Sequence, residues 1–288
     1  MIVFPNAKIN LGLNVLRKRG DGFHDLETLF YPVPLYDVLE IMIVRDNVPI
    51  KGSYIQVITE SGFKINFTSS GLPVSGEPEN NLCIRAILAF DKIYGLPGNL
   101  AIHLHKVIPM GAGLGGGSSD AAYTLKVLNQ LSGNKANEKT LLKIAAELGS
   151  DCSFFIRNAP AYGQGRGEVL IAATLSLAGY HLVIVMPEIH VGTASAFRGI
   201  TPGLPVERIE EITRLDVALW KNRLINDFET SVFPGNPEIA ALKELLYDKG
   251  AVYASMTGSG AAVYGLFKEG LQDKNIDKDY FWFSCVLK

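Results

Sequence analysis

Apolar and polar positions alternate along the first part of the chain. This period of two is typical of strands with one buried face, and it predicts strands at residues 9–16, 26–35 and 38–44. Polar turns such as residues 19–22 separate these strands. Residues 46–80 are expected to form a hairpin with loops. The first part of the chain should therefore be rich in strands.

Farther along, apolar residues recur every three or four positions. This spacing predicts helices at residues 81–94, 118–131 and 138–148. A strand with apolar alternation is predicted at residues 100–109, between the first two helices. The chain is therefore expected to add helices to the sheet of its first part.

Beyond residue 157 the alternation restarts and predicts a second sheet. Its strands are expected near residues 168–172, 181–186, 251–256 and 261–267. A helix at residues 237–247, capped by Asn236 and ended by Gly250, should cover this sheet. The connection at residues 187–206 is expected to be irregular and outside the core. The whole pattern predicts an α+β fold.

Composition narrows the classes of function. The chain has 288 residues, 48% of them hydrophobic, which suits two lobes that share one active site. The formal net charge is −2 and the basic residues are scattered, so neither nucleic acid nor a membrane is expected as a partner. No apolar stretch reaches membrane-spanning length, and the N-terminus lacks a basic region followed by an apolar core. A cytoplasmic protein is therefore expected. The three cysteines, Cys83, Cys152 and Cys285, indicate neither a disulfide framework nor a zinc site.

The most informative segment is the glycine-rich run PMGAGLGGGSS at residues 109–119. It lies between a predicted strand and a predicted helix. Glycine lets a backbone approach phosphate without a Cβ in the way, and the positive end of the helix dipole favours an anion. Ser118 or Ser119 is expected to cap the helix. The run therefore predicts a nucleotide site.

Three other classes of nucleotide-binding protein fit the sequence less well. Gly111, Gly113 and Gly116 match G-x-G-x-x-G, which keeps an NAD-dependent oxidoreductase as an alternative. However, the second parallel strand that should end in an acidic residue is missing. The sequence also lacks the G-x-x-x-x-G-K-[ST] motif and the protein-kinase motifs H-R-D and D-F-G.

Residues 109–122 resemble the phosphate-binding motif of the GHMP kinases, the superfamily of galactokinase, homoserine kinase, mevalonate kinase and phosphomevalonate kinase. Three more segments match one branch of that superfamily in order, at residues 7–12, 19–28 and 148–155, and residues 256–262 resemble the C-terminal glycine motif of the superfamily. The resemblance implies a two-lobed fold. Its expected parts are a ribosomal-S5-like, ATP-binding N-terminal lobe at residues 1–157 and a ferredoxin-like C-terminal lobe at residues 158–288.

The triple glycine resembles one branch of that superfamily in particular. Its members use ATP to phosphorylate the 2-hydroxyl of 4-diphosphocytidyl-2-C-methyl-D-erythritol, in the non-mevalonate route to isoprenoid precursors. The resemblance thus implies a cytidine-diphosphate substrate. A sugar or mevalonate-type kinase remains the alternative within the superfamily. An inactive, nucleotide-binding regulator remains the alternative outside the enzymes.

The resemblance also assigns catalytic roles. Asp151 would accept the proton of the substrate hydroxyl, and Lys8 would lie beside it and keep its carboxylate ionised. Taken alone, the residues allow a plainer interpretation. Asp151 would cap the apolar segment at residues 152–156, and Lys8 would be a snorkelling residue at a sheet edge.

For ATP, the resemblance implies contacts from the glycine-rich run and from both lobes, namely Asn81, Lys106, Pro109, Met110, Gly111, Ala112, Gly113, Leu114, Gly115, Gly116, Gly117, Ser118, Ser119, Gly258 and Ser259. Magnesium (Mg2+) should bridge the phosphates, although no carboxylate that would hold it can be identified. Asp120 departs from the small or amide residue usual after the serines. An acid there would repel triphosphate unless it points away, caps the helix or binds the metal, and its role stays open.

Substrate recognition calls for a cytosine reader. By resemblance, Phe23 and His24 contact the base and Phe197 supplies a second stacking face, while Asn10 and Thr193 are assigned by position. The alternative is that these residues have structural roles. Phe23 would be a turn residue packed on the core, His24 would bond its own backbone, and Phe197 would anchor a helix. His103 and His105, which alternate on one strand, are more typical of a strand surface than of a metal site.

Overall fold

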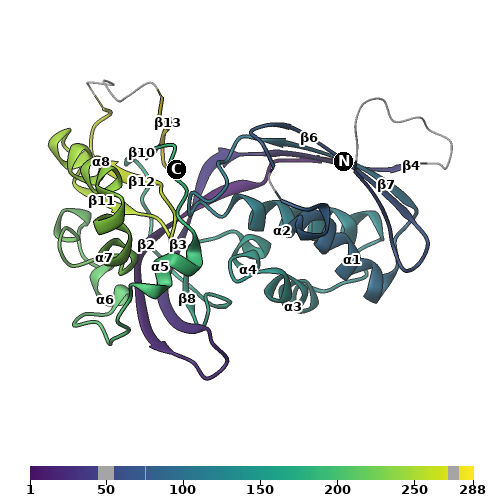
Figure 1. The fold of residues 1–288 in the computed structure, drawn as a ribbon, viewed down its shortest axis with the longest axis horizontal. Helices are drawn as coiled ribbons and strands as arrows, with labels where there is room; N and C mark the ends of the chain where they lie inside the picture. Colours follow the sequence, from purple (N-terminus) through teal and green to yellow (C-terminus); the bar gives the residue numbers. More distant parts are fainter. Residues whose placement is uncertain (45–54, 75, 272–278) are drawn as a thin grey trace. The chain divides into compact units, whose positions relative to one another are not determined.

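The computed structural model describes residues 1–44, 55–74, 76–271 and 279–288 (Figure 1). The chain forms two compact units, each assembled from separate segments. Unit 1 comprises residues 1–7, 35–109 and 115–158, and unit 2 comprises residues 8–34, 110–114 and 159–288. The predicted division into lobes at residues 157 and 158 stays a prediction. No helix in the described ranges is long and apolar enough to cross a membrane.

Unit 1 is built on a five-stranded sheet. The strands follow the order β1 (Ile2–Val3), β4 (Val38–Val44), β7 (Asn99–Lys106), β6 (Lys64–Gly71) and β5 (Ile55–Ile58). Only β6 and β7 pair in parallel; the other neighbours are antiparallel. Leu39 pairs with Leu104 and Ile41 with Ile102, and these apolar side chains are buried. The alternation seen in the sequence thus gives the sheet one buried face.

Helices complete unit 1. They are η1 (Pro78–Asn80), α1 (Leu82–Tyr94), α2 (Gly116–Leu131), α3 (Glu138–Leu148) and α4 (Cys152–Arg157). The four α-helices pack on one another, and their buried residues share faces spaced three and four positions apart. In α1 that face carries Ile84, Ile87 and Phe90. The apolar period therefore produces a helical layer against the sheet.

Unit 2 contains two four-stranded sheets. One has the order β2 (Asn6–Lys18), β3 (His24–Tyr36), β8 (Ala161–Gln164) and β9 (Val169–Ala172). The other, antiparallel throughout, has the order β11 (Tyr253–Met256), β12 (Val263–Phe267), β10 (His181–Met186) and β13 (Phe281–Val286). Residues 19–23 form the turn between β2 and β3.

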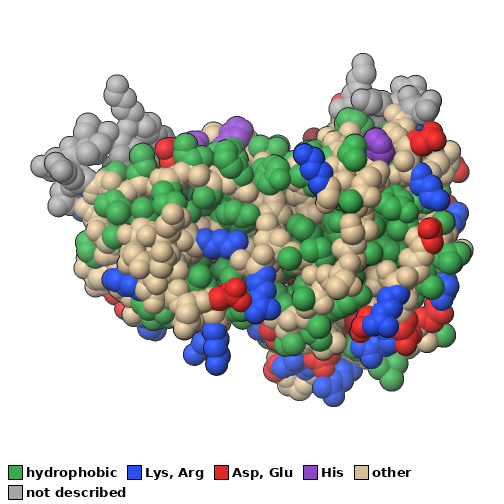
Figure 2. All heavy atoms as spheres, turned by 180° about the vertical axis from the view of Figure 1, so that it is seen from behind, with side chains coloured by type: hydrophobic (Ala, Val, Ile, Leu, Met, Phe, Trp, Pro, Cys, Tyr) green, Lys and Arg blue, Asp and Glu red, His purple; other side chains and the backbone are tan. Residues whose placement is uncertain are grey.

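Unit 2 also contains helices. They are α5 (Thr193–Arg198), α6 (Ile209–Ile212), η2 (Val217–Leu219), α7 (Phe228–Val232), η3 (Phe233–Gly235) and α8 (Pro237–Asp248). Helix α8 packs on β11 and β12. Its Ile239, Leu242 and Leu246 join Val183 and Val263 of the sheet in one buried cluster. On the face drawn in Figure 2, acidic and basic side chains are interspersed among neutral and apolar ones.

The α+β class predicted from the sequence is confirmed. The strands at 38–44 and 181–186 and the helix at 138–148 occur at their predicted residues. The predicted hairpin at 46–80 appears as the β5–β6 pair, and part of that range lies outside the described residues. The irregular connection predicted at 187–206 is wrong in part, because α5 forms there and buries Ala196. The sequence patterns also missed the short elements β8, β13, α6 and α7.

Candidate active site

Two glycine-containing loops of unit 2 pack backbone against backbone. A Cβ on Gly113, which has φ +76°, would lie 1.9 Å from the carbonyl oxygen of Thr257. A Cβ on Gly260 would lie 2.2 Å from the amide nitrogen of Gly113. Ala262 N donates to Ala112 O at 3.3 Å, and Thr257 Oγ1 donates to Gly113 O at 3.1 Å. These glycines are therefore needed for packing, whatever ligand the loops bind.

Lys8 is fixed beside this loop pair. Its side chain is only 2% exposed, and its Nζ donates to Gly113 O at 2.9 Å and to Asn10 Oδ1. Asn10 in turn donates through Nδ2 to Thr28 Oγ1 at 2.9 Å. Because the ammonium group lies in the interior, the interpretation of Lys8 as a snorkelling edge residue is wrong. The structure brings the predicted residues Lys8, Asn10 and Gly113 together.

Three aromatic rings of unit 2, those of His24, Phe197 and Phe228, contact one another in series and are called the ring chain below. The rings of His24 and Phe197 stack with centroids 4.6 Å apart and an interplanar angle of 14°. Phe197 also meets the ring of Phe228 edge to face, with centroids 4.8 Å apart. Phe23 is 52% exposed, and the guanidinium of Arg166 lies 4.8 Å from its ring centroid. The structure thus joins His24 to Phe197 and leaves Phe23 at the surface.

Ser259 also has a partner from the predicted set. Its Oγ donates to Thr193 Oγ1 at 3.2 Å; Thr193 is exposed and Ser259 is half-buried. Gly258 follows Thr257 with φ +57°, a conformation that favours glycine. Thr193 thus lies at the glycine loop that ends β11, a proximity that no local pattern in the sequence indicates.

In unit 1 the glycine run starts α2 differently from the prediction. Gly115, in the left-handed conformation with φ +72°, is the residue before the helix, and no side chain caps the first turn. The expected cap by Ser118 or Ser119 is therefore wrong. Ser119 Oγ is buried and, within the described part of the chain, has no hydrogen-bond partner. The N–H groups of the first turn are left without a side-chain acceptor, as at helix ends that bind anions.

A buried ion cluster lies under this helix start. Lys106 is 2% exposed, and its Nζ binds Asp120 Oδ2 at 3.0 Å and Asp37 Oδ2. Asp37 also accepts hydrogen bonds from the backbone N–H groups of Val107 and Ile108. A Cβ on Gly116 would lie 2.7 Å from Lys106 Nζ, so the first residue of α2 packs directly against the side chain of this lysine. Asp120, whose role the sequence left open, is thus an ion-pair partner of Lys106.

Burial and charge shift the pKa values in the cluster. Burial raises the pKa of Asp120 to about 7, against the opposing effect of Lys106. Burial by itself would lower the pKa of Lys106, but Asp120 and Asp37 together raise it above its ordinary value. Burial also raises the pKa of the neighbouring Cys83 thiol. Lys106 therefore stays charged while Asp120 titrates near neutral pH.

Two other predicted residues occupy helix starts in unit 1. Asn81 caps α1, where its Oδ1 accepts from Cys83 N at 2.9 Å. Asp151 precedes α4, but its side chain does not cap that helix, so the plainer interpretation of this residue is wrong. Gly149 ends α3 and places Asp151 in the turn between two helices. The pairing of Asp151 with Lys8 stays a prediction.

His103 and His105 bind serine and threonine side chains on the strand surface, as expected. His103 bonds Thr68 and Ser70, and His105 bonds Ser70. Among the residues that the structure describes, no three His, Cys, Asp or Glu side chains form a group able to hold a metal.

Three residues that support the site were missed from the sequence. Thr257 bonds Asn10 and Gly113, Asp37 holds Lys106, and Asn226 binds the carbonyl oxygens of Met256 and Gly258. Thr257 lies inside the C-terminal glycine motif and could have been included on that ground. Asp37 and Asn226 follow no motif, since their partners are distant in the sequence.

Comparisons with known proteins cover most of the chain. Residues 81–158 match the model of the GHMP kinases N terminal domain, and residues 200–277 match that of the GHMP kinases C terminal domain. A protein of Bacteroides fragilis named 4-diphosphocytidyl-2-C-methyl-D-erythritol kinase is 49% identical over 291 residues, which cover both chains completely. A protein of the same name from Porphyromonas gingivalis is 42% identical over 290 residues, again over both full lengths.

Solved structures agree. The crystal structure of a 4-(cytidine 5'-diphospho)-2C-methyl-D-erythritol kinase aligns with a TM-score of 0.73 and 32% identity, covering 92% of this chain and 90% of that one. The mevalonate kinase of Methanococcus jannaschii aligns with a TM-score of 0.69 over 100% and 98% of the two chains. At 15% identity, that likeness shows the fold alone.

Proposed function

The chain belongs to the GHMP kinase family, and on that premise we propose that it transfers the γ-phosphoryl group of ATP to the 2-hydroxyl of 4-diphosphocytidyl-2-C-methyl-D-erythritol. One observation carries the choice of acceptor. Relatives named 4-diphosphocytidyl-2-C-methyl-D-erythritol kinase are 42–49% identical to the chain over its full length. The reaction supplies a step in the synthesis of isoprenoid precursors.

In the proposed reaction, the 2-hydroxyl oxygen bonds to the γ-phosphorus while the bond from the γ-phosphorus to the β,γ-bridging oxygen breaks and ADP leaves. Asp151 takes the hydroxyl proton. The transition state of such transfers is loose, so positioning and charge stabilisation matter more than strong deprotonation. Lys8 suits the second task, because its buried ammonium group is held in place by Gly113 and Asn10.

We assign the ATP phosphates to the glycine run and the start of α2. The uncapped first turn offers N–H donors and the positive end of the helix dipole. Mg2+ would supply charge neutralisation between the phosphates. It commonly takes most of its ligands from phosphates and water, which is compatible with a protein side that offers few carboxylates.

The aromatic rings support a cytidine acceptor. Phe197 stacks on His24 and is backed by Phe228, so one ring of the pair has a firm support. Two ring contacts with a base between them need about 7 Å, since carbon atoms in contact lie about 3.5 Å apart. His24 and Phe197 must therefore separate when a base enters. Asn10 and Thr193 are proposed to contact the remainder of the substrate.

One experiment tests the function. The purified protein is incubated with Mg-ATP and, separately, with the diphosphocytidyl alcohol, mevalonate, homoserine and galactose, and products are identified by mass. We expect a phosphorylated product from the diphosphocytidyl alcohol only. Phosphorylation of mevalonate or a sugar instead would overturn the acceptor. Binding of NAD(H) without any kinase activity would favour the oxidoreductase, and ATP binding without turnover would favour a regulator.

A further inference from the structure

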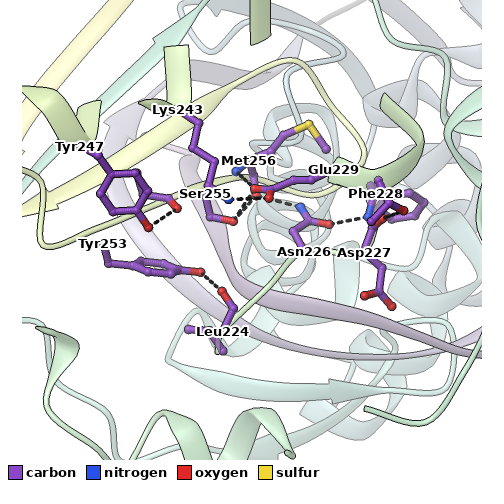
Figure 3. Close-up of polar contacts among 12 residues, drawn as sticks. Leu224, Asn226, Asp227, Phe228, Glu229, Lys243, Tyr247, Tyr253, Ser255 and Met256 are labelled. Carbon is purple, nitrogen blue, oxygen red and sulfur yellow. Dashed lines mark hydrogen bonds and ion pairs between the residues drawn. The ribbon is translucent and has the colours of Figure 1, made fainter. Parts of the chain in front are cut away.

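A short segment of unit 2, residues 224–229, contacts both the glycine loop after β11 and the ring of Phe197. Figure 3 shows polar contacts of this segment. Asn226 is 1% exposed, and both hydrogens of its amide are used: Nδ2 donates to Met256 O and to Gly258 O, each at 2.8 Å. Its Oδ1 accepts from Phe228 N at 3.1 Å. A single buried amide thus links the backbone of Phe228 to the glycine loop.

Phe228 carries the second contact. Its buried ring meets Phe197 edge to face at 4.8 Å with an angle of 87°, and Phe197 stacks on His24. An edge-to-face pair fixes the plane of each ring, because the positive edge of one faces the negative face of the other. Phe228 therefore sets the plane that Phe197 offers to a base.

The segment itself is held firmly. Leu13 N donates to Ile225 O at 2.9 Å, and Asp227 N donates to Leu13 O at 2.8 Å, which joins the segment to β2. Glu229 accepts from Met256 N at 2.9 Å and pairs with Lys243 at 2.6 Å (Figure 3). Because these contacts fix the segment, a substitution at Asn226 or Phe228 is expected to act mainly on the groups that the two side chains contact.

The loop that Asn226 holds leads to Lys8. Thr257, between the two carbonyl groups that Asn226 binds, donates to Gly113 O. Gly113 O is also an acceptor for the Lys8 ammonium group. The path from Asn226 to Lys8 thus consists of one loop residue and one shared carbonyl oxygen.

We infer that Asn226 and Phe228 are separate positioning residues for the two halves of the reaction. Asn226 fixes the glycine loop and, through Gly113, the Lys8 ammonium group. Phe228 fixes the Phe197 ring that stacks on the acceptor's base. This inference rests on the proposed function, because it assigns the ring chain to a cytidine acceptor and Lys8 to phosphoryl transfer.

The test is a kinetic split between two variants. Asn226→Ala removes one hydrogen bond from each of the carbonyl groups of Met256 and Gly258, of which Met256 O still accepts from Ser255, so we expect kcat to fall about ten- to a hundredfold with little change in the KM of the acceptor. Phe228→Leu removes the ring edge, so we expect the acceptor KM to rise about three- to tenfold at nearly constant kcat. If Asn226→Ala does not fold, Asn226→Ser retains one donor and should show a smaller loss of kcat.

Tyr253→Phe is the matched control. Tyr253 Oη donates to Leu224 O at 2.8 Å, so the variant removes a buried hydrogen bond to the same segment but touches neither the glycine loop contacts nor Phe197. It should lower Tm and leave kcat and KM unchanged. Parallel changes in kcat and KM in both variants, or the same changes in the control, would overturn the inference. An unmutated protein that does not phosphorylate the diphosphocytidyl alcohol would instead overturn the proposed function.

Discussion

Two buried lysines of this protein have different surroundings. Lys106 binds the carboxylates of Asp37 and Asp120, which neutralise its charge in place. Lys8 donates to the backbone carbonyl of Gly113 and the side-chain carbonyl of Asn10. These two oxygens fix the position of the Lys8 ammonium group. At the residue scale, Lys106 therefore supports the start of α2, while Lys8 suits a role in charge stabilisation.

The role of Asp151 can be tested by one substitution. Asp151→Asn keeps the size of the side chain but cannot take the hydroxyl proton, so we expect the turnover rate to fall by roughly two to four orders of magnitude. ATP affinity, measured by calorimetry, should stay nearly unchanged because the carboxylate acts on the acceptor. A variant with near-normal turnover would remove Asp151 from the mechanism.

The buried cluster makes stability depend on pH. Because burial raises the pKa of Asp120 to about 7, the folded state holds a proton there that the unfolded state has already lost above pH ~4. This contribution is complete at low pH and disappears as the pH rises through 7. Asp120→Asn mimics the protonated form, so its Tm relative to the unmutated protein should increase between pH 5 and pH 8.

Thermal unfolding across that range checks this expectation. Lys106, Asp37 and the Cys83 thiol face Asp120, and Lys106 keeps its charge throughout. Asp21→Asn is the control, because the hydrogen bond from Arg19 lowers the pKa of that exposed carboxyl out of the range. A Tm difference for Asp120→Asn that does not vary with pH would show that Asp120 keeps one protonation state.

At the scale of elements, the sequence predicted the long segments with a clear period and failed on the short ones. The strand at 181–186 and the helix at 138–148 carry enough periodic residues to be recognised. Helix α5 has six residues, and its stability comes from packing of Ala196 and Phe197 that no local pattern records. The serine cap failed because Gly115 turns the chain into α2 in a left-handed conformation.

The same limit applies to the site. The glycine run was predicted as a phosphate loop, and that assignment stays a prediction. The structure adds that Gly113 also packs against Thr257 O, and that Gly116 packs against Lys106. Such contacts depend on how the chain folds, so they cannot be predicted from local patterns in a single sequence.

These contacts predict different outcomes for two glycines of one run. Gly113→Ala would place a Cβ 1.9 Å from Thr257 O at φ +76°, so we expect Tm to fall by about 5 °C or more. Gly117→Ala meets only Leu82 Cδ1, at 3.7 Å, and should fold normally. If phosphate lies against the helix start, that second variant should still weaken ATP binding, as measured by calorimetry. Unchanged ATP affinity would show that Gly117 does not approach the nucleotide.

At the scale of the whole molecule, the fold does not select the acceptor. Mevalonate and homoserine kinases share this fold at 12–18% identity, and their names show that they act on other alcohols. GHMP kinases use ATP as the phosphoryl donor, so the donor does not distinguish one of them from another. Selection of the acceptor must therefore come from side chains that differ within the fold. In this protein the stacked pair of His24 and Phe197 is our candidate.

Nucleotide competition tests that candidate most directly. If His24 and Phe197 bind cytosine, CDP should compete with the acceptor and not with ATP, and UDP should bind about ten- to a hundredfold more weakly. The reason is that uracil presents a carbonyl where cytosine presents an amine, which leaves two acceptors facing each other in a desolvated pocket. His24→Ala should remove much of the preference for cytosine. Phe197→Ala should weaken both nucleotides by a similar factor, because stacking does not depend on the base edge. Equal inhibition of the unmutated protein by CDP and UDP would contradict cytosine recognition and leave an unspecified small-molecule kinase.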